Sequence, residues 1–194
     1  MPMSIKDMLL LLVGLDSEEE GLGGMTRLQK LLFLLAKEKK VEEVEGGFEF
    51  VPYKAGPYSS KLYDQLEFLE NVGMIESRVA GDALEAEAAD ISVLSYEDLI
   101  EDGAETTDDG KKVDGLGSAD AYKERHFKLT KTGLERMAKV ASSKENAPIV
   151  DAIRETKKTY GKHSLNDLLY YVYTKYPEFT TESEIKDQVL RRGR

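Results

Sequence analysis

Residues 66–78 read LEFLENVGMIESR, and residues 126–137 read HFKLTKTGLERM. The first segment has the pattern of a helix that ends at a glycine, Gly73, and turns directly into a strand. The second segment has the pattern of a strand that runs into a helix with threonine near its start. Together they predict two antiparallel strands flanked by helices, although the two halves stand far apart in the chain.

Around these segments, the predicted elements follow the order helix, helix, strand, helix, strand, gap, strand, helix. This is the order of a winged helix-turn-helix domain, a variant of the helix-turn-helix motif in which a β-hairpin forms a wing. We therefore predict a mainly α fold with a small β wing, of the α+β class. The domain is expected to span residues 1–145, with an acidic insertion over 81–123. Residues 146–194 are expected to form a C-terminal helical extension that packs on it.

Apolar spacing and turn residues place the individual elements. Thr26 is expected to cap the second helix, and Pro57 to stand at the first position of the third helix. Capping boxes are expected at two later helices, formed by the pairs Thr132–Glu135 and Thr181–Glu184. The predicted helices cover residues 5–15, 26–40, 57–72, 91–100, 132–144, 148–160, 164–175 and 181–190. Strands are predicted over 48–51, 74–79 and 125–129, and a loop over 16–24.

The composition is that of a globular chain that contains no cysteine. It has 194 residues, of which 41% are hydrophobic and 33% are charged. The length suits one domain with an elaboration. The absence of cysteine excludes a disulfide framework and a thiolate metal site, and it is typical of a protein in the reducing cytoplasm. The apolar run over residues 9–13 is too short to span a membrane.

Negative charge is concentrated in the predicted insertion. Residues 82–120 contain thirteen acidic and two basic residues, a net charge of −11 against −10 for the whole chain. The remaining residues therefore carry about one positive charge in total. An acidic segment in place of a wing tip would repel a DNA duplex, mimic one, or attract a basic partner. A solvated loop is the simpler alternative.

Two further segments resemble a known family. Residues 25–35 read MTRLQKLLFLL, and residues 50–63 read FVPYKAGPYSSKLY. These are similar to the Panacea (SocA-like antitoxin) domains and to the YwgA-like uncharacterised proteins, which share an LQKLL helix followed by a Y.GP.S..LY segment. The similarity extends loosely to residues 168–178. It implies a small regulatory or toxin-neutralising module rather than an enzyme, and the acidic insertion is not part of the family pattern.

Motifs for catalysis are missing from the chain. The two histidines, His126 and His163, stand apart in sequence, and a catalytic site needs several groups that converge. Neither a phosphate-binding glycine loop nor a Gly-x-Ser-x-Gly elbow occurs. The sequence therefore predicts no enzymatic activity, no cofactor and no metal site, and an enzyme built on acidic residues is the least favoured alternative.

DNA binding is the alternative to a protein partner. Neutralisation of phosphates requires lysine and arginine, and the return strand offers a basic strip of Lys123, Arg125, Lys128 and Lys131. Arg136 and Lys139 continue this strip on the next helix. The third helix, by contrast, presents three carboxylates, those of Asp64, Glu67 and Glu70. These would repel phosphates, so DNA binding is disfavoured.

The favoured function is a non-catalytic regulatory or antitoxin-like module that acts through protein contacts. The candidate partner-binding residues are those where the family resemblance is densest, namely Tyr53, Lys54, Tyr58, Ser59 and Lys61. The expected partner is a toxin or regulator protein, and no membrane association is expected. The oligomeric state is open, with a homodimer as one alternative.

An aromatic cluster near the C-terminus is expected to serve mainly in packing. It consists of Tyr170, Tyr171, Tyr173, Tyr176 and Phe179. Helical spacing brings several of these rings to one side of a helix, where they would cover the body of the protein.

Overall fold

The computed structural model describes residues 3–17, 21–39, 41, 44–45, 47–79 and 125–192. The predicted insertion over 81–123 lies outside these residues. So do the helix predicted over 91–100 and one residue of the basic strip, Lys123.

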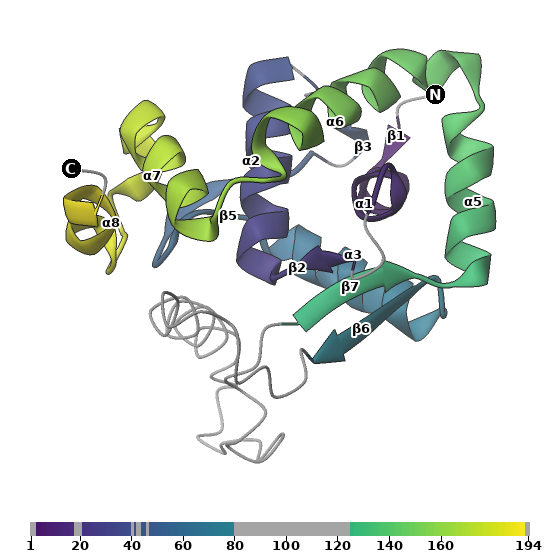
Figure 1. The fold of residues 1–194 in the computed structure, drawn as a ribbon, viewed down its shortest axis with the longest axis horizontal. Helices are drawn as coiled ribbons and strands as arrows, with labels where there is room; N and C mark the ends of the chain where they lie inside the picture. Colours follow the sequence, from purple (N-terminus) through teal and green to yellow (C-terminus); the bar gives the residue numbers. More distant parts are fainter. Residues whose placement is uncertain are drawn as a thin grey trace.

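The described chain is mainly helical, with a small antiparallel sheet, and so belongs to the α+β class (Figure 1). The first half contains β1 (Met3–Ser4), α1 (Ile5–Gly14), β2 (Leu22–Gly23), α2 (Met25–Lys39), β3 (Val44–Glu45), β4 (Val51–Tyr53), β5 (Gly56–Tyr58), α3 (Ser60–Asn71) and β6 (Ile75–Val79). The second half contains β7 (Arg125–Leu129), α5 (Lys131–Ala141), η1 (Lys144–Asn146), α6 (Ala147–Tyr160), α7 (Leu165–Lys175), η2 (Pro177–Thr180) and α8 (Lys186–Arg192).

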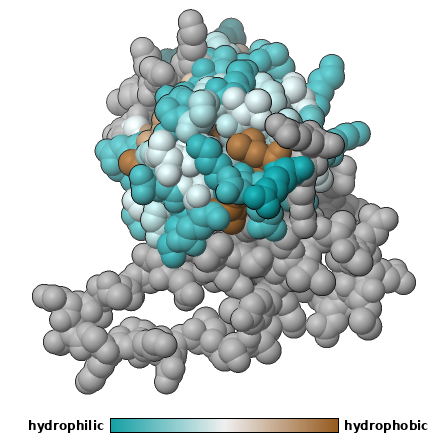
Figure 2. All heavy atoms as spheres, turned by 90° about the vertical axis from the view of Figure 1, so that its left-hand side faces the viewer, coloured by the Kyte–Doolittle hydropathy of each residue, from teal (hydrophilic) through white to brown (hydrophobic). Residues whose placement is uncertain are grey.

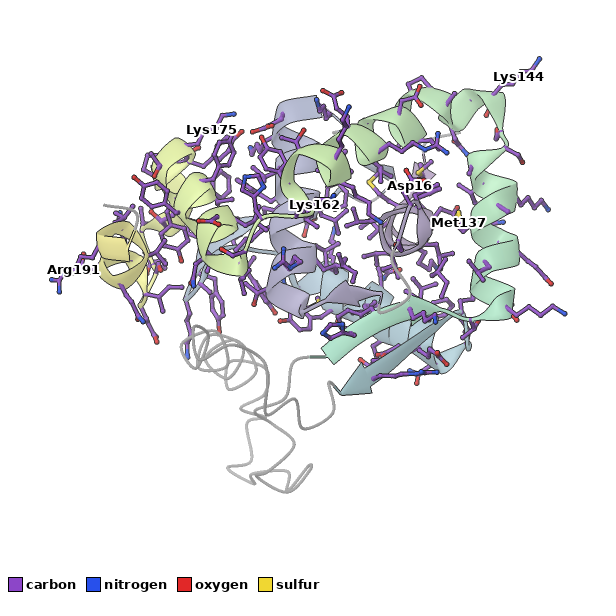
Figure 3. All side chains as sticks on the ribbon, in the orientation of Figure 1. Asp16, Met137, Lys144, Lys162, Lys175 and Arg191 are labelled. Atoms are coloured by element: carbon purple, nitrogen blue, oxygen red, sulfur yellow. The ribbon has the colours of Figure 1, made fainter. Side chains whose placement is uncertain are left out.

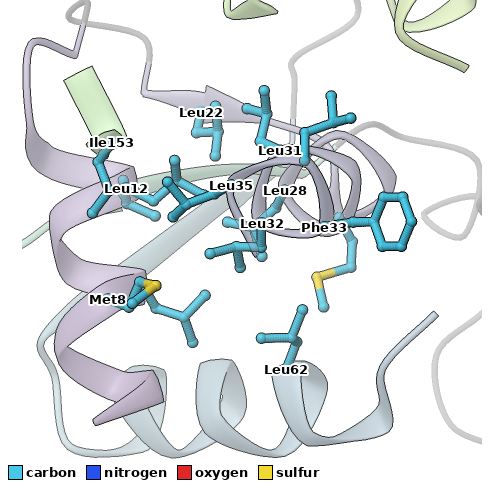
Figure 4. Packing of buried hydrophobic residues seen from close by; sticks show 14 of the residues in the cluster. Met8, Leu12, Leu22, Leu28, Leu31, Leu32, Phe33, Leu35, Leu62 and Ile153 are labelled. Atoms are coloured by element: carbon cyan, nitrogen blue, oxygen red, sulfur yellow. The ribbon is translucent and has the colours of Figure 1, made fainter. Parts of the chain in front are cut away.

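Helix α1 lies in the middle of the molecule, and Figure 1 shows it end-on with α3, α5, α6 and the sheet around it. Its apolar residues from Met8 to Val13 are buried because neighbours cover every side of the helix. Figure 4 shows Met8 and Leu12 packed among leucines of α2, Leu62 of α3 and Ile153 of α6. One continuous core therefore joins the N-terminal helices to the C-terminal extension.

The small sheet pairs the strand in residues 66–78 with the strand in residues 126–137. Its strand order is β2–β7–β6, and β6 pairs with β7 in the antiparallel register Ile75 to Leu129. Both predicted strands are confirmed, and β7 has the predicted bounds. The loop predicted over 16–24 is wrong in one part, because Leu22–Gly23 forms β2 against β7. A strand of two residues is too short to show an alternating pattern in the sequence, so only its pairing with the distant β7 reveals it.

The end of α3 is formed as predicted. Gly73 has a φ of +68°, a conformation that glycine adopts without steric cost. The N–H of Gly73 donates to the carbonyl of Glu70, and the N–H of Met74 donates to that of Leu69, each at 2.9 Å. These two bonds make a Schellman motif, which ends the helix and directs the chain into β6.

The start of α3 differs from the prediction. Pro57 does not open the helix but lies in β5, which forms a hairpin with β4. Pro52 and Pro57 face each other in this hairpin, and neither has an N–H to donate, so the neighbouring residue pairs carry the ladder. Gly56 has a φ of +86° at the turn. Of the strand predicted over 48–51, only Val51 belongs to β4.

Three of the predicted helix caps are wrong. Thr26 lies inside the first turn of α2, and its buried hydroxyl has no hydrogen-bond partner among the described residues. Thr130, and not Thr132, caps α5, and its Oγ1 accepts from the N–H of Gly133 at 3.2 Å. The same hydroxyl donates to the Gly73 carbonyl at 2.6 Å, which links the cap of α5 to the end of α3. The last predicted box, at Thr181, is replaced by the 3₁₀ turn η2 and the later helix α8.

The two threonines at the start of α5 give a direct test. Thr130→Ala should lower the free energy of unfolding by about 1–2 kcal/mol, because it removes the cap and the link to α3. Thr132 is exposed, so Thr132→Ala should change stability by less than about 0.5 kcal/mol. Urea unfolding followed by circular dichroism measures both. A larger loss for Thr132→Ala would restore the capping box predicted from sequence.

The C-terminal extension packs against α2 and the β4–β5 hairpin. Helices α6 and α7 have nearly the predicted bounds. The chain then turns through η2, so that its last described helix, α8, packs on α7. Among the described helices, none combines the length and the apolar character needed to cross a membrane.

Candidate functional site

The predicted partner-binding residues lie together on the β4–β5 hairpin and the start of α3. Tyr53 belongs to β4, Lys54 to the hairpin turn and Tyr58 to β5, while Ser59 and Lys61 flank the first residue of α3. The hairpin was not predicted. It brings side chains from both strands onto the same small surface.

Three tyrosine rings form the centre of this surface. The ring centroids of Tyr53 and Tyr58 are 4.7 Å apart, and those of Tyr58 and Tyr63 are 5.6 Å apart, with interplanar angles of 35° and 38°. We call Tyr53, Tyr58 and Tyr63 the tyrosine stack. All three are half-buried. Tyr63, on α3, was not among the predicted site residues, because only the hairpin fold brings Tyr58 against the helix.

The hydroxyl groups of Tyr53 and Tyr58 have no hydrogen-bond partner among the described residues. Partial burial raises the pKa of Tyr58, and the nearby Tyr53 hydroxyl and Asp64 carboxylate raise it further. Tyr58 therefore stays a neutral hydrogen-bond donor at physiological pH.

Ser59 is not part of the exposed surface. Its side chain is 1% exposed, and its Oγ donates to the carbonyl of Phe48. Its backbone N–H donates to Oε1 of Gln29 at 2.9 Å. The prediction that Ser59 contacts a partner is therefore corrected, because the residue anchors the junction of β5 and α3 to the underlying α2.

A buried lysine supports the hairpin from the same side. Lys30 is 2% exposed, and its Nζ donates to the carbonyl of Pro57 at 2.9 Å. Burial lowers the pKa of Lys30 to about 7. The amide nitrogen of Gln29, the preceding residue, is also buried and has no hydrogen-bond partner in the part of the chain that the structure describes. In the sequence, Gln29 and Lys30 stand out as two polar residues between Leu28 and Leu31, within an otherwise apolar part of the helix.

The C-terminal extension holds the hairpin from another side. The carbonyl of Lys54 accepts from the N–H of Glu184 at 2.9 Å and from Oγ of Ser183 at 3.1 Å. Ser183 also bonds to the hydroxyl of buried Tyr173 at 2.7 Å. The ring of Tyr173 lies over Gly56, where an added Cβ would come within 2.8 Å of it. Figure 1 shows α7 and α8 beside the hairpin, and Figure 2 shows that this end of the molecule is mostly hydrophilic.

The two lysines of the predicted site are matched by carboxylates of the same chain. Nζ of Lys61 lies 2.5 Å from Glu49, and Nζ of Lys54 lies 3.9 Å from Glu184. The exposed carboxylates of Asp64 and Glu67 on α3 form no ion pair with any described residue. The surface around the tyrosine stack is therefore net negative.

The predicted basic strip is interrupted. Lys128 is exposed on β7, but the register places it directly opposite Glu76. Lys131 is exposed at the start of α5, and Arg125 is described only as a backbone position in β7. Arg136 forms a bidentate ion pair with Asp7 of α1, with both N–O distances 2.8 Å. It therefore fastens α5 to α1 instead of extending the strip.

The C-terminal aromatic residues pack as predicted. Tyr173 is buried, and the rings of Tyr176 and Phe179 meet Phe33 edge-on, with centroids 5.1 and 4.9 Å away. Tyr171 has a polar role as well. Its hydroxyl donates to Glu38 of α2 at 2.8 Å.

Glu38 is the centre of a polar network that joins α2, α6 and α7. It accepts from the hydroxyls of Tyr160 and Tyr171 and from Nζ of Lys175, at 2.7, 2.8 and 2.6 Å. Figure 3 labels Lys175 where α7 approaches α2. Burial alone would raise the pKa of Glu38, but the three hydrogen bonds outweigh it and hold the pKa below its usual range.

Glu38→Gln should lower the free energy of unfolding by about 1–2 kcal/mol, because three charge-assisted hydrogen bonds are weakened. Since the folded-state pKa is lowered, this contribution is present near neutral pH and is lost as the pH falls through the carboxyl range. The measurement is the melting temperature of wild type and variant at pH 7 and pH 3.5. Glu178→Gln, at an exposed position near the end of α7, is the matched control.

Comparison with known proteins leaves the family open. The chain matches no protein-family model, and no curated protein is similar to it in sequence. Within the part of the chain that the structure describes, no group of three or more histidine, aspartate or glutamate residues is arranged to hold a metal ion.

Proposed function

We propose that this protein is a non-catalytic regulatory module, antitoxin-like in character, that binds a protein partner through the tyrosine stack. The observation that carries the proposal is the pair Tyr53 and Tyr58, whose rings are held in place while their hydroxyls have no partner in the described residues. Tyrosine is enriched at protein interfaces because one rigid side chain offers both apolar area and a hydrogen bond. Anchoring from α2 and from the C-terminal extension keeps the ordering cost of binding low.

We further propose that the N-terminal part is a winged helix with its wing interrupted. The order α1, β2, α2, α3, β6, β7 and the sheet order β2–β7–β6 support this proposal. An additional hairpin between α2 and α3 carries the tyrosine stack. The helix that would read DNA in such a domain is α3.

DNA binding is supported less well than protein binding. Asp64 and Glu67 are exposed on α3, and they would lie against phosphates if this helix entered a groove. A gel shift with duplex DNA at low salt tests this alternative, using the full chain and a variant that lacks residues 82–120. Binding by the shortened variant alone would identify the acidic segment as an inhibitor of DNA binding.

Affinity capture from the native host tests the proposed function. The bait is the full chain, and the variants are Tyr53→Ala and Tyr58→Ala, with Tyr170→Ala on α7 as a matched control. We expect one protein to be captured by wild type and by the control but reduced at least tenfold with either stack variant. Circular dichroism should show that all variants are folded. Equal capture by every folded variant would rule out the tyrosine stack as the interface.

A further inference from the structure

The charges around the tyrosine stack indicate what kind of side chain the partner presents. Lys54 and Lys61 are paired with Glu184 and Glu49, so they contribute little net charge. Asp64 and Glu67 remain exposed on α3, without an ion pair among the described residues. The carboxylate of Asp64, which follows Tyr63 of the stack on α3, lies within electrostatic range of the Tyr58 hydroxyl.

Rings of this kind attract cations through their faces. Elsewhere in the molecule, the chain places its own lysines over aromatic rings, with Lys6 4.3 Å from the centroid of Phe68 and Lys37 4.9 Å from that of Phe179. No described cation lies over Tyr53 or Tyr58. These two rings, together with the exposed carboxylate of Asp64 on α3, can therefore accept a cation from outside the chain.

We propose that the tyrosine stack binds an arginine side chain in a basic segment of a protein partner. The guanidinium group contacts the tyrosine stack at Tyr53 and Tyr58 and pairs with the carboxylate of Asp64. Arginine fits better than lysine, because its planar group is more weakly hydrated and can stack and form hydrogen bonds at the same time. This inference rests on the proposed function, since it specifies the partner for the same surface.

Charge disfavours two other occupants of this surface. Residues 82–120 of the same chain carry a net charge of −11, so the exposed carboxylates of α3 repel them. Nucleic acid is repelled for the same reason. The negative charge of residues 82–120 instead favours the approach of a basic partner, because long-range attraction raises association rates.

Peptide binding tests the inference without knowledge of the natural partner. The probe is a fluorescein-labelled peptide of alternating glycine and arginine with three arginines, and the comparison peptide has lysine at the same positions. Fluorescence anisotropy at 150 mM salt measures the affinity of each peptide for the full-length protein. We expect the arginine peptide to bind wild type about fivefold more tightly than the lysine peptide.

Variants locate the binding. Tyr58→Ala and Asp64→Asn should each weaken binding of the arginine peptide about fivefold or more. Glu135→Gln removes an exposed carboxylate on α5, at the opposite end of the molecule from the hairpin, and should leave the affinity unchanged (Figure 1). Because residues 82–120 are present in every variant, their contribution cancels in the comparison.

The outcomes separate this inference from the proposed function. The inference is overturned if wild type does not bind the arginine peptide, if both peptides bind equally, or if Tyr58→Ala and Asp64→Asn bind like wild type. If Tyr58→Ala nevertheless loses the native partner in affinity capture, the interface stands and only the arginine chemistry fails. If capture is also unchanged, both proposals fail.

Discussion

Replacing Gly133 with alanine should destabilise the protein by about 3 kcal/mol or prevent its folding. A Cβ at this position would lie 1.9 Å from the carbonyl oxygen of Met74, a distance that no real contact allows. The clash is with backbone, so a side-chain rotation cannot relieve it. Either α5 or the start of β6 must shift, and the shift would disrupt the contact between Thr130 and Gly73.

Urea unfolding of Gly133→Ala is best compared with Gly73→Ala. Gly73 has a positive φ of +68° but open space around an added Cβ, so its substitution should cost only about 1 kcal/mol of backbone strain. The difference between the two variants isolates the steric term. Equal losses at the two positions would contradict the close approach of α5 to Met74.

Stability should depend on pH through Lys30. The pKa of this buried lysine is lowered from 10.5 to about 7, so between these pH values the unfolded chain binds more protons than the folded chain. The free energy of unfolding therefore rises with pH across this window, by up to about 1.4 kcal/mol per pH unit and at most about 5 kcal/mol in total. Below pH 7, the buried charge is present in full and stability is lowest.

The measurement is the free energy of unfolding of wild type and Lys30→Met from pH 6 to pH 10. Methionine has a similar shape and no charge, so the difference between the two proteins isolates Lys30. We expect wild type to gain stability relative to Lys30→Met as the pH rises. Lys131→Met, at an exposed position, controls for the loss of one positive charge. If the difference in free energy of unfolding between wild type and Lys30→Met does not change with pH, the pKa of Lys30 is not lowered by burial.

Much of the secondary structure could be predicted from the sequence, because the signals were local. The apolar spacing of α2, the glycine at the end of α3 and the strand pattern of β7 each involve a few consecutive residues. Gly133 also belongs to a local pattern, the strand-to-helix segment over residues 126–137. The need for glycine at this position is not local, because any side chain there would clash with the distant carbonyl of Met74.

The candidate site was predicted in part. Tyr53, Lys54, Tyr58 and Lys61 were placed in one region, and the structure brings them together. Ser59 was misassigned to the surface, because an isolated polar residue gives no sign that a helix thirty residues earlier will cover it. Tyr63 was missed, because only the hairpin folds Tyr58 back against α3.

By itself, the sequence determined the helical class, strands over 74–79 and 125–129 and the concentration of acid in residues 82–120, because periodicity, turn residues and charge are properties of the chain. Only the tertiary structure decided which threonine caps α5, which polar residues are buried, and which charges remain unmatched. Those outcomes depend on contacts between distant residues, such as Lys54 with Glu184 and Lys30 with Pro57. The proposed role of the tyrosine stack depends on these contacts, since they hold its rings in place and leave Asp64 exposed beside them.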